Sequence, residues 1–119
     1  MPSRDEHLER ARQNEEFAGS LDIDRAIQAD WAVTILFYSA LHYVDAYLAV
    51  KSYHPPDHDA RDSEIENNGS LADIYKDYRR LKDRSREARY NVANFHPDQF
   101  PPLKARFDRI KRHVLSKLR

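Results

Sequence analysis

The sequence has 119 residues, of which 40% are hydrophobic and 34% are charged. This length suits one domain, residues 1–119, and is too short for two domains with separate cores. Only two glycines are present, and together with the high charge content this favours solvated helices over a turn-rich sheet, so we expect an all-α fold. The absence of cysteine excludes disulfides, thiolate metal sites and cysteine nucleophiles.

The formal net charge is zero, but the charges are divided unequally along the chain. Residues 1–75 contain six Lys or Arg and fifteen Asp or Glu, whereas residues 76–119 contain fourteen and five. The two parts therefore carry formal charges of −9 and +9. Either these charges neutralise each other across neighbouring helices, or a basic surface remains that attracts a polyanion.

The first two predicted helices cover residues 4–18 and the stretch from Asp22 or Asp24, either of which suits an N-cap, to about residue 51. Between Trp31 and Val50 the second helix is apolar on most of its circumference. A helix that is hydrophobic all round must be covered on several sides. We expect it to be the central helix of a bundle or to pack in part against a second subunit.

Two proline-containing segments separate the remaining helices. Residues 52–59 form a loop, followed by a short helix over residues 60–67. Ser70 is expected to cap a third long helix that reaches about residue 92. The segment FHPDQFPP forms a second loop, and a last helix over residues 103–118 carries one apolar stripe. The pattern predicts an antiparallel four-helix bundle with an additional short helix.

The expected location is the cytoplasm. The start of the chain, MPSRDEHLER, is charged and lacks the apolar stretch of a secretory signal. His42 and Asp45 interrupt the longest apolar run, which makes it a poor membrane span. We therefore expect no membrane association.

Three stretches of the sequence together resemble one protein family. They are DWAVTILFYSALHYVDAYL, the proline loop HPPDHDAR and IYKDYRRLKDRSREARY, and in this order they resemble the HEPN domains over about residues 22–92. The resemblance implies a small helical bundle that commonly forms a homodimer. It also implies either a metal-independent endoribonuclease of toxin–antitoxin or defence systems, or a non-catalytic RNA-binding or interaction module.

The stretch SREARYNVANFH holds the residues that the resemblance singles out. Active HEPN members carry an arginine and a histidine separated by four to six residues, and Arg89 and His96 have six residues between them. Arg89 would stabilise the phosphate and His96 would transfer protons, with both copies brought together at a dimer cleft. Further contacts to RNA are expected from neighbouring polar residues: Arg86, Asn91 and Asn94.

The same residues also allow a purely structural interpretation. Arg89 can pair with an acid such as Glu87, His96 can cap a helix end, and the two asparagines can terminate the helix. Arg106 and His113 have the same spacing, so spacing alone does not identify a site. Active members usually have a polar residue directly after the arginine, whereas Tyr90 stands here. A non-catalytic partner of a nucleotidyltransferase-type or antitoxin-type protein is the alternative function.

Other candidate sites in the sequence have simpler interpretations. His54 and His58 flank the prolines of the first loop, but no third metal ligand is fixed by spacing, so we expect no metal. We expect His58 and Arg61 to cap or anchor the short helix that follows. His42 is expected to be a core histidine bonded to a carbonyl, Asp45 or Tyr38. No cofactor is expected, because two glycines cannot build a phosphate loop.

Overall fold

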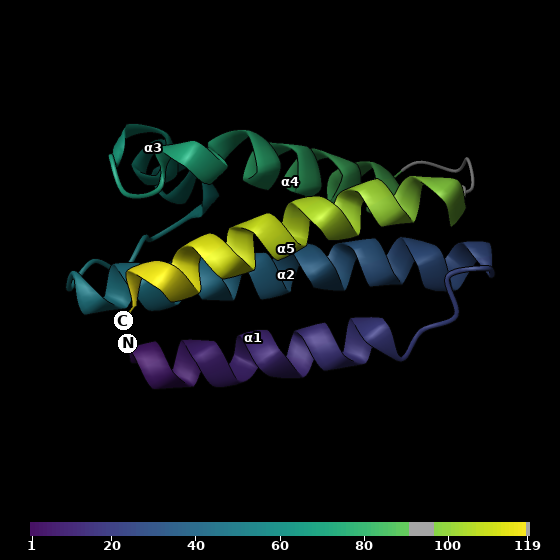
Figure 1. The fold of residues 1–119 in the computed structure, drawn as a ribbon, viewed down its shortest axis with the longest axis horizontal. Coiled ribbons are helices and arrows are strands. Elements are labelled where there is room, and N and C mark those ends of the chain that lie inside the picture. The colour runs from purple at the N-terminus through teal and green to yellow at the C-terminus, as the bar shows by residue number, and fades with distance from the viewer. Residues whose placement is uncertain (91–96, 119) are drawn as a thin grey trace.

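A computed structural model describes residues 1–90 and 97–118 of the chain. The described residues contain five α-helices, two 3-10 turns and no strand, which confirms the all-α prediction (Figure 1). The α-helices are α1 (Arg4–Gly19), α2 (Ala26–Val50), α3 (His58–Asn67), α4 (Tyr75–Tyr90) and α5 (Phe100–Lys117). The 3-10 turns are η1 (Ala72–Ile74) and η2 (Pro97–Gln99).

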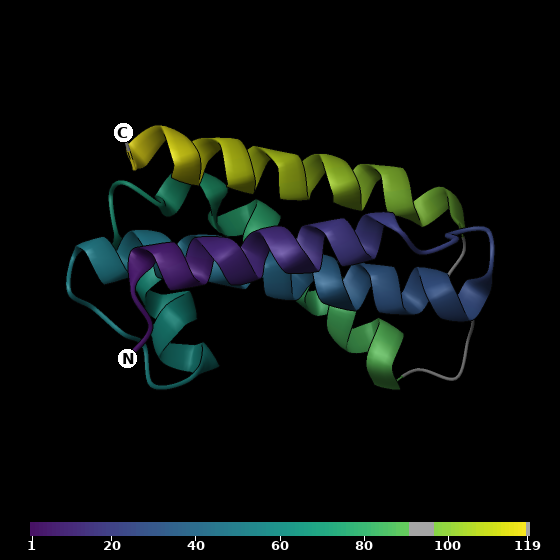
Figure 2. The same cartoon turned by 90° about the horizontal axis from the view of Figure 1, so that it is seen from below.

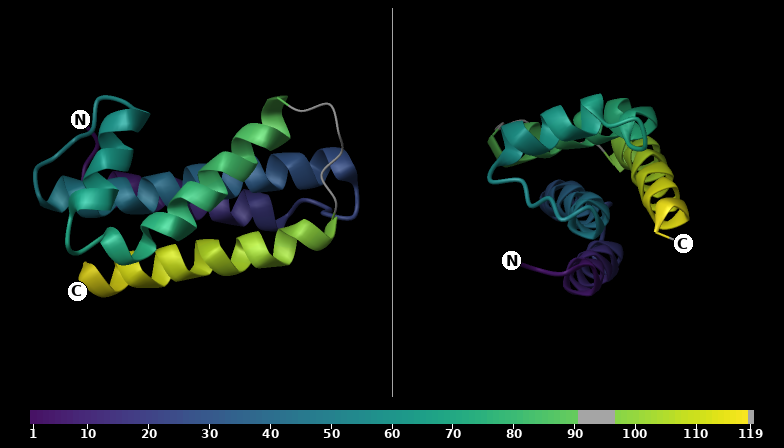
Figure 3. Two further views of the ribbon diagram at one scale, coloured as in Figure 1. Left: turned by 90° about the horizontal axis from the view of Figure 1, so that it is seen from above. Right: turned by 90° about the vertical axis from the view of Figure 1, so that its left-hand side faces the viewer.

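Helix α2 is the centre of the fold. Helix α1 runs alongside it (Figure 2), and α4 and α5 pack against α2 and against each other, as the end view in Figure 3 shows. Fifteen of the 25 residues of α2 are buried, in agreement with its nearly all-round apolar character. By length and hydropathy α2 could cross a membrane, but 72% of its apolar window is buried inside the protein, as in a core helix.

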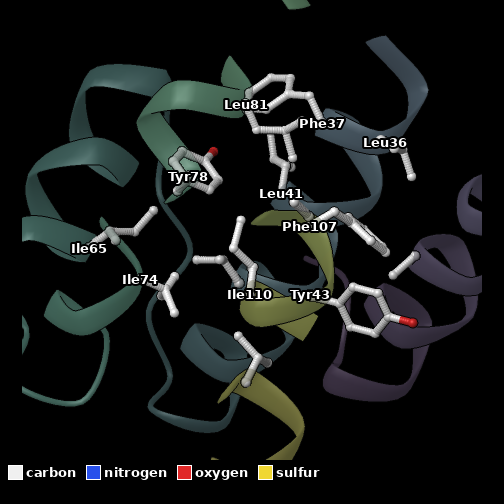
Figure 4. Close-up of a cluster of buried hydrophobic side chains, with 14 of the residues drawn as sticks. Leu36, Phe37, Leu41, Tyr43, Ile65, Ile74, Tyr78, Leu81, Phe107 and Ile110 are labelled. Atoms are coloured by element: carbon white, nitrogen blue, oxygen red, sulfur yellow. The ribbon is translucent and has the colours of Figure 1, made fainter. Parts of the chain in front are cut away.

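The core forms where α2 meets α4 and α5. Four aromatic side chains are fully buried there, two from α2 and one each from α4 and α5 (Figure 4): Phe37, Tyr43, Tyr78 and Phe107. The rings of Phe37 and Tyr78 are 5.6 Å apart and tilted, and those of Tyr43 and Phe107 are 6.2 Å apart. Such tilted pairs stabilise the packing beyond the area that they bury. The three long helices are therefore held together by aromatic contacts.

The starts of two helices differ from the sequence-based prediction. Helix α2 begins at Ala26 with Arg25 as its N-cap, because the Asp22 carboxylate accepts a hydrogen bond from the backbone N–H of Asp24 and closes a turn instead. Helix α4 begins at Tyr75, since the side chain of Asn68 accepts from the backbone N–H of Ser70 and starts the turn that leads into η1. Aspartate and asparagine close local turns as readily as they cap helices.

The starts of α3 and α5, in contrast, lie earlier than predicted. Asp57 caps α3 by accepting a hydrogen bond from the backbone N–H of Ala60 at 2.8 Å, so His58 is already helical. Helix α5 includes the last two of the three prolines of the predicted loop, Pro101 and Pro102, because the first turn of a helix leaves its N–H groups without intrahelical acceptors. The missing N–H of proline costs nothing at these positions.

Ion pairs fix the short helix α3 to its neighbours. Arg61 of α3 makes two parallel hydrogen bonds to Asp45 of α2, Nε to Oδ1 at 2.8 Å and Nη2 to Oδ2 at 3.0 Å. Asp62, the next residue, accepts from Arg79 and Lys82 of α4. Paired arginine–carboxylate contacts of this kind define orientation as well as contributing energy. Helix α3 is thereby placed beside α4.

Candidate nucleic-acid interface

One face of α4 carries four basic residues. Arg79, Lys82, Arg86 and Arg89 follow each other in steps of three, four and three residues, so they lie along the same side of the helix. With α3 and Phe37 of α2 they form a hollow of about 290 Å³. We call it the basic cleft; it is lined by Phe37, His58, Asp59, Arg79, Lys82, Asp83, Arg86 and Arg89.

The charges at one end of the basic cleft are neutralised. Arg79 lies 2.9 Å from the Asp62 carboxylate and 3.6 Å from that of Asp83. Lys82 also pairs with Asp62. The predicted neutralisation of basic by acidic segments therefore occurs at this end, beside α3.

Arg86 and Arg89, at the other end of the cleft, differ from Arg79 and Lys82. Both are exposed, and neither has a carboxylate partner within residues 1–90 and 97–118. Arg89 donates a hydrogen bond to Ser85 Oγ at 3.3 Å. Glu87, the acid expected as a partner for Arg89 in the structural interpretation, pairs with Arg84 instead. This end therefore presents two guanidinium groups that form no ion pair with a described acid.

His58 lies in the wall of the same cleft. Its ring centre is 6.2 Å from that of Phe37, and its Nδ1 is 3.4 Å from Nη1 of Arg61. Burial, followed by the charges of Arg61 and Lys82, holds the pKa of His58 below its ordinary value. Asp57, not His58, caps α3, whereas Arg61 anchors this helix to Asp45 of α2, as expected. A neutral imidazole thus faces the cationic cleft.

A second hollow adjoins the basic cleft and shares Arg89 with it. We call it the aromatic pocket; its volume is about 450 Å³ and it is lined by Ile27, Asp30, Trp31, Thr34, Ala88, Arg89 and Tyr90. Trp31 is 55% exposed and Tyr90 is 75% exposed, which is high for aromatic side chains. The Arg89 guanidinium lies 5.6 Å from the centre of the Tyr90 ring and 5.9 Å from that of Tyr38. Arginine therefore links the charged and the aromatic surfaces.

The sequence-predicted site is only partly within the described residues. Arg86 and Arg89 lie together in the basic cleft. His96, Asn91 and Asn94 lie outside the described residues. Their expected roles therefore stay predictions.

The second arginine–histidine pair of the same spacing has structural roles. Arg106 pairs with Asp77 of α4 at 3.1 Å. His113 Nε2 lies 2.6 Å from the backbone oxygen of Ser70. These contacts join α5 to α4 and to the turn before η1. Position in the fold thus distinguishes Arg89 from Arg106, which the spacing could not do.

Two further histidines form a contact that the sequence did not predict. His42 of α2 makes its hydrogen bond with His7 of α1, Nδ1 to Nδ1 at 3.1 Å, rather than with Asp45 or Tyr38. The carboxylate of Asp45 forms an ion pair with Arg61 instead. Within the part of the chain that the structure describes, no group of three or more potential metal ligands gathers.

Comparisons of the chain with protein-family models, with curated proteins and with solved structures give no match. Because no family is identified, the protein is classified by its fold and its surface features. It is an all-helical protein with an arginine-lined cleft that opens beside an aromatic pocket.

Proposed function

We propose that this chain is a HEPN-like, RNA-directed protein of the cytoplasm that binds RNA along the basic cleft. The observation that carries the proposal is the pair of exposed arginines, Arg86 and Arg89, with no carboxylate partner among the described residues. A guanidinium in this state is available to bind a phosphate through two parallel hydrogen bonds. The four-helix arrangement of the HEPN bundle and its homodimer belong to the same proposal.

The proposal extends to cleavage of RNA without a metal ion. This reaction requires a base to deprotonate the 2′-hydroxyl, an acid to protonate the leaving 5′-oxygen and a cation to stabilise the phosphate. Arg89 is exposed in the basic cleft and suits the last role. His96, assigned from the spacing in the sequence, supplies proton transfer. A homodimer would bring two such pairs to one phosphate.

The first prediction concerns the affinity for single-stranded RNA and its dependence on salt. We expect the double variant Arg86→Ala/Arg89→Ala to bind roughly tenfold more weakly at physiological salt. We also expect its slope of log K against log salt to be about 1.4 units shallower, since two phosphate contacts are lost. Fluorescence anisotropy of a labelled oligonucleotide at several salt concentrations measures both quantities.

The matched control for this measurement lies on the same helix. Lys76 and Arg80 are exposed residues of α4 that do not line the basic cleft. The variant Lys76→Ala/Arg80→Ala removes the same charge from a different face of α4. If this control variant weakens RNA binding as much as the cleft variant does, RNA is attracted by the basic segment as a whole, and the basic cleft is not the binding site.

The second prediction concerns catalysis. Wild-type protein is expected to cut a mixed RNA pool in excess EDTA, and Arg89→Ala and His96→Ala are each expected to abolish cleavage while folding persists. Circular dichroism and sedimentation of each variant provide the folding and assembly controls. An inert wild type, or variants that cut as well as the wild type, would contradict the nuclease assignment and leave RNA binding to be judged by the affinity measurement.

A non-catalytic interaction module is the second candidate. It is favoured by Tyr90 in place of the usual polar residue and by the exposed apolar side chains at the aromatic pocket, of which Ile27 is 69% exposed. In this function the chain would bind RNA beside a nucleotidyltransferase-type or antitoxin-type partner. RNA binding through the cleft together with absent cleavage would support it.

A further inference from the structure

We propose that the aromatic pocket binds an unpaired base of single-stranded RNA, stacked on Trp31 and Tyr90, while the adjoining phosphate lies on Arg86 and Arg89. The inference rests on the proposed function, because it names the form of RNA that the basic cleft recognises. It adds a second part to the site, with a different chemistry from the first. Trp31 and Tyr90 are the specificity-determining residues in this arrangement.

The exposure of the pocket's aromatic side chains is the first argument. Phe37, Tyr43 and Tyr47 of the same helix are buried in the core, whereas Trp31 is 55% exposed, so much of its surface does not contribute to packing. Trp31 and Tyr90 instead border a hollow of about 450 Å³, within the size range of small-molecule sites. Exposed aromatic rings beside cations are the usual means by which proteins hold single strands.

The charge distribution is the second argument, because it separates the place for a phosphate from the place for a base. Four basic side chains line the basic cleft, whereas Arg89 is the one basic side chain that lines the aromatic pocket, so a phosphate is favoured in the cleft. In the cleft, Arg86 and Arg89 form no ion pair with a described acid. The aromatic pocket therefore suits a neutral, flat group, and the basic cleft suits an anion. A nucleotide has these two parts joined by a short link.

Arg89 gives the two hollows a common wall. Its guanidinium lies within 6 Å of the ring centres of Tyr38 and Tyr90, so its flat face is directed by aromatic contacts. The same group lines the basic cleft. A base in the pocket and its own phosphate in the cleft would therefore both contact Arg89. Paired strands keep their bases stacked inside the duplex, so only a single strand can insert one.

A second copy of the chain is a less suitable occupant. A direct two-fold contact of this patch with itself would bring Arg86 and Arg89 close to their own copies with no phosphate between them, whereas the proposed homodimer brings the arginines together around one phosphate. Among the described residues no carboxylate is paired with either arginine to offset that repulsion. An RNA strand brings the compensating negative charge with it.

The test uses Trp31, which is the sole tryptophan of the sequence and therefore the source of the tryptophan fluorescence. The probe is a 2′-O-methyl oligoadenylate decamer, which the proposed reaction cannot cut because its 2′-oxygens are blocked. Its controls are an abasic strand of equal length and charge and the corresponding duplex. We expect the decamer to quench Trp31 in parallel with binding, the abasic strand to bind more weakly without quenching, and the duplex not to quench.

Substitution of the pocket completes the test. We expect Trp31→Ala and Tyr90→Ala each to weaken decamer binding roughly tenfold and to leave binding of the abasic strand unchanged. Phe17→Ala is the matched control, since Phe17 is an exposed aromatic residue of α1 outside the pocket. Its affinities should equal those of the wild type.

Three results would overturn the inference, and they separate it from the proposed function. Decamer binding that depends on Arg86 and Arg89 without quenching, or with equal quenching by the abasic strand, rejects the pocket and retains the cleft. Absence of any binding rejects both. A concentration-dependent change of Trp31 fluorescence without RNA, with a dimer that Trp31→Ala dissociates, shows that a second copy covers the pocket.

Discussion

Replacing Arg61 by alanine is expected to lower the free energy of unfolding by about 3–5 kcal/mol. The side chains of Arg61 and Asp45 are only 10% and 8% exposed, and they are joined by two hydrogen bonds. The substitution would leave the Asp45 carboxylate buried without its charged partner. Desolvation of an unpaired charge costs far more than the loss of a surface contact. Urea unfolding followed by circular dichroism measures the change.

A double substitution separates the net contribution of the ion pair from the cost of leaving the Asp45 carboxylate buried without a partner. Asp45→Leu/Arg61→Met removes both charges and retains similar volume, so we expect it to unfold within about 1 kcal/mol of the wild type or to be more stable. Arg4→Ala breaks the exposed pair with Asp5 and should change stability by less than about 0.5 kcal/mol. A loss below about 1 kcal/mol for Arg61→Ala would mean that water reaches the pair.

The Arg61–Asp45 pair also connects stability to the proposed site. It anchors α3 on α2, and α3 supplies His58 and Asp59 to the wall of the basic cleft. Asp62 on the same helix neutralises Arg79 and Lys82, which leaves the free positive charge at Arg86 and Arg89. The placement of one short helix thus determines which end of the cleft can attract a phosphate.

The helices themselves could be predicted because their signals are local. Periodic apolar residues in α4 and α5, the nearly all-round apolar α2 and the proline segments between helices determine the order of the elements. The helix starts were less predictable, because Asp22, Asn68 and Asp57 each compete for nearby N–H groups. Which N–H a short polar side chain takes depends on the path of the chain around it.

The site was predictable only in part. Arg89 was singled out by its spacing from His96, and Arg86 as a neighbouring polar residue. The spacing of Arg79, Lys82, Arg86 and Arg89 also contained the signal for a basic face of the helix. The cleft also requires α3, which is placed through long-range ion pairs. The exposure of Trp31 could not be predicted, since a helix that is apolar all round does not show which few residues remain uncovered.

Lowering the pH from 7 to 4 is expected to destabilise the contact between α1 and α2 through the His7–His42 hydrogen bond. Burial, followed by the proximity of His7, lowers the pKa of His42 to about 4, against an ordinary value of 6.5. Burial also lowers the pKa of His7, with Asp45 opposing the shift. Between pH 6.5 and 4 the unfolded chain therefore binds protons that the folded chain does not.

The sign of the effect follows from this difference in proton binding. Stability from His42 is fully present above pH 6.5, falls as the pH decreases and reaches its lower limit near pH 4. We expect a loss of about 1–2 kcal/mol, less than the full pKa difference implies, because the imidazole of His42 keeps some contact with water. Urea unfolding at successive pH values measures the loss.

Carboxylates also titrate in this interval, so the diagnostic quantity is the difference between the wild type and a variant. His42→Asn keeps a hydrogen-bonding group but cannot take up the proton, and its stability should decline less steeply with falling pH. Ser39→Ala, which removes the buried hydrogen bond from Ser39 Oγ to the Ala11 carbonyl between α1 and α2, should lower stability and retain the wild-type slope, because serine does not titrate in this interval. Equal slopes for wild type and His42→Asn would mean that His42 gains its proton as readily in the folded protein as in the unfolded chain.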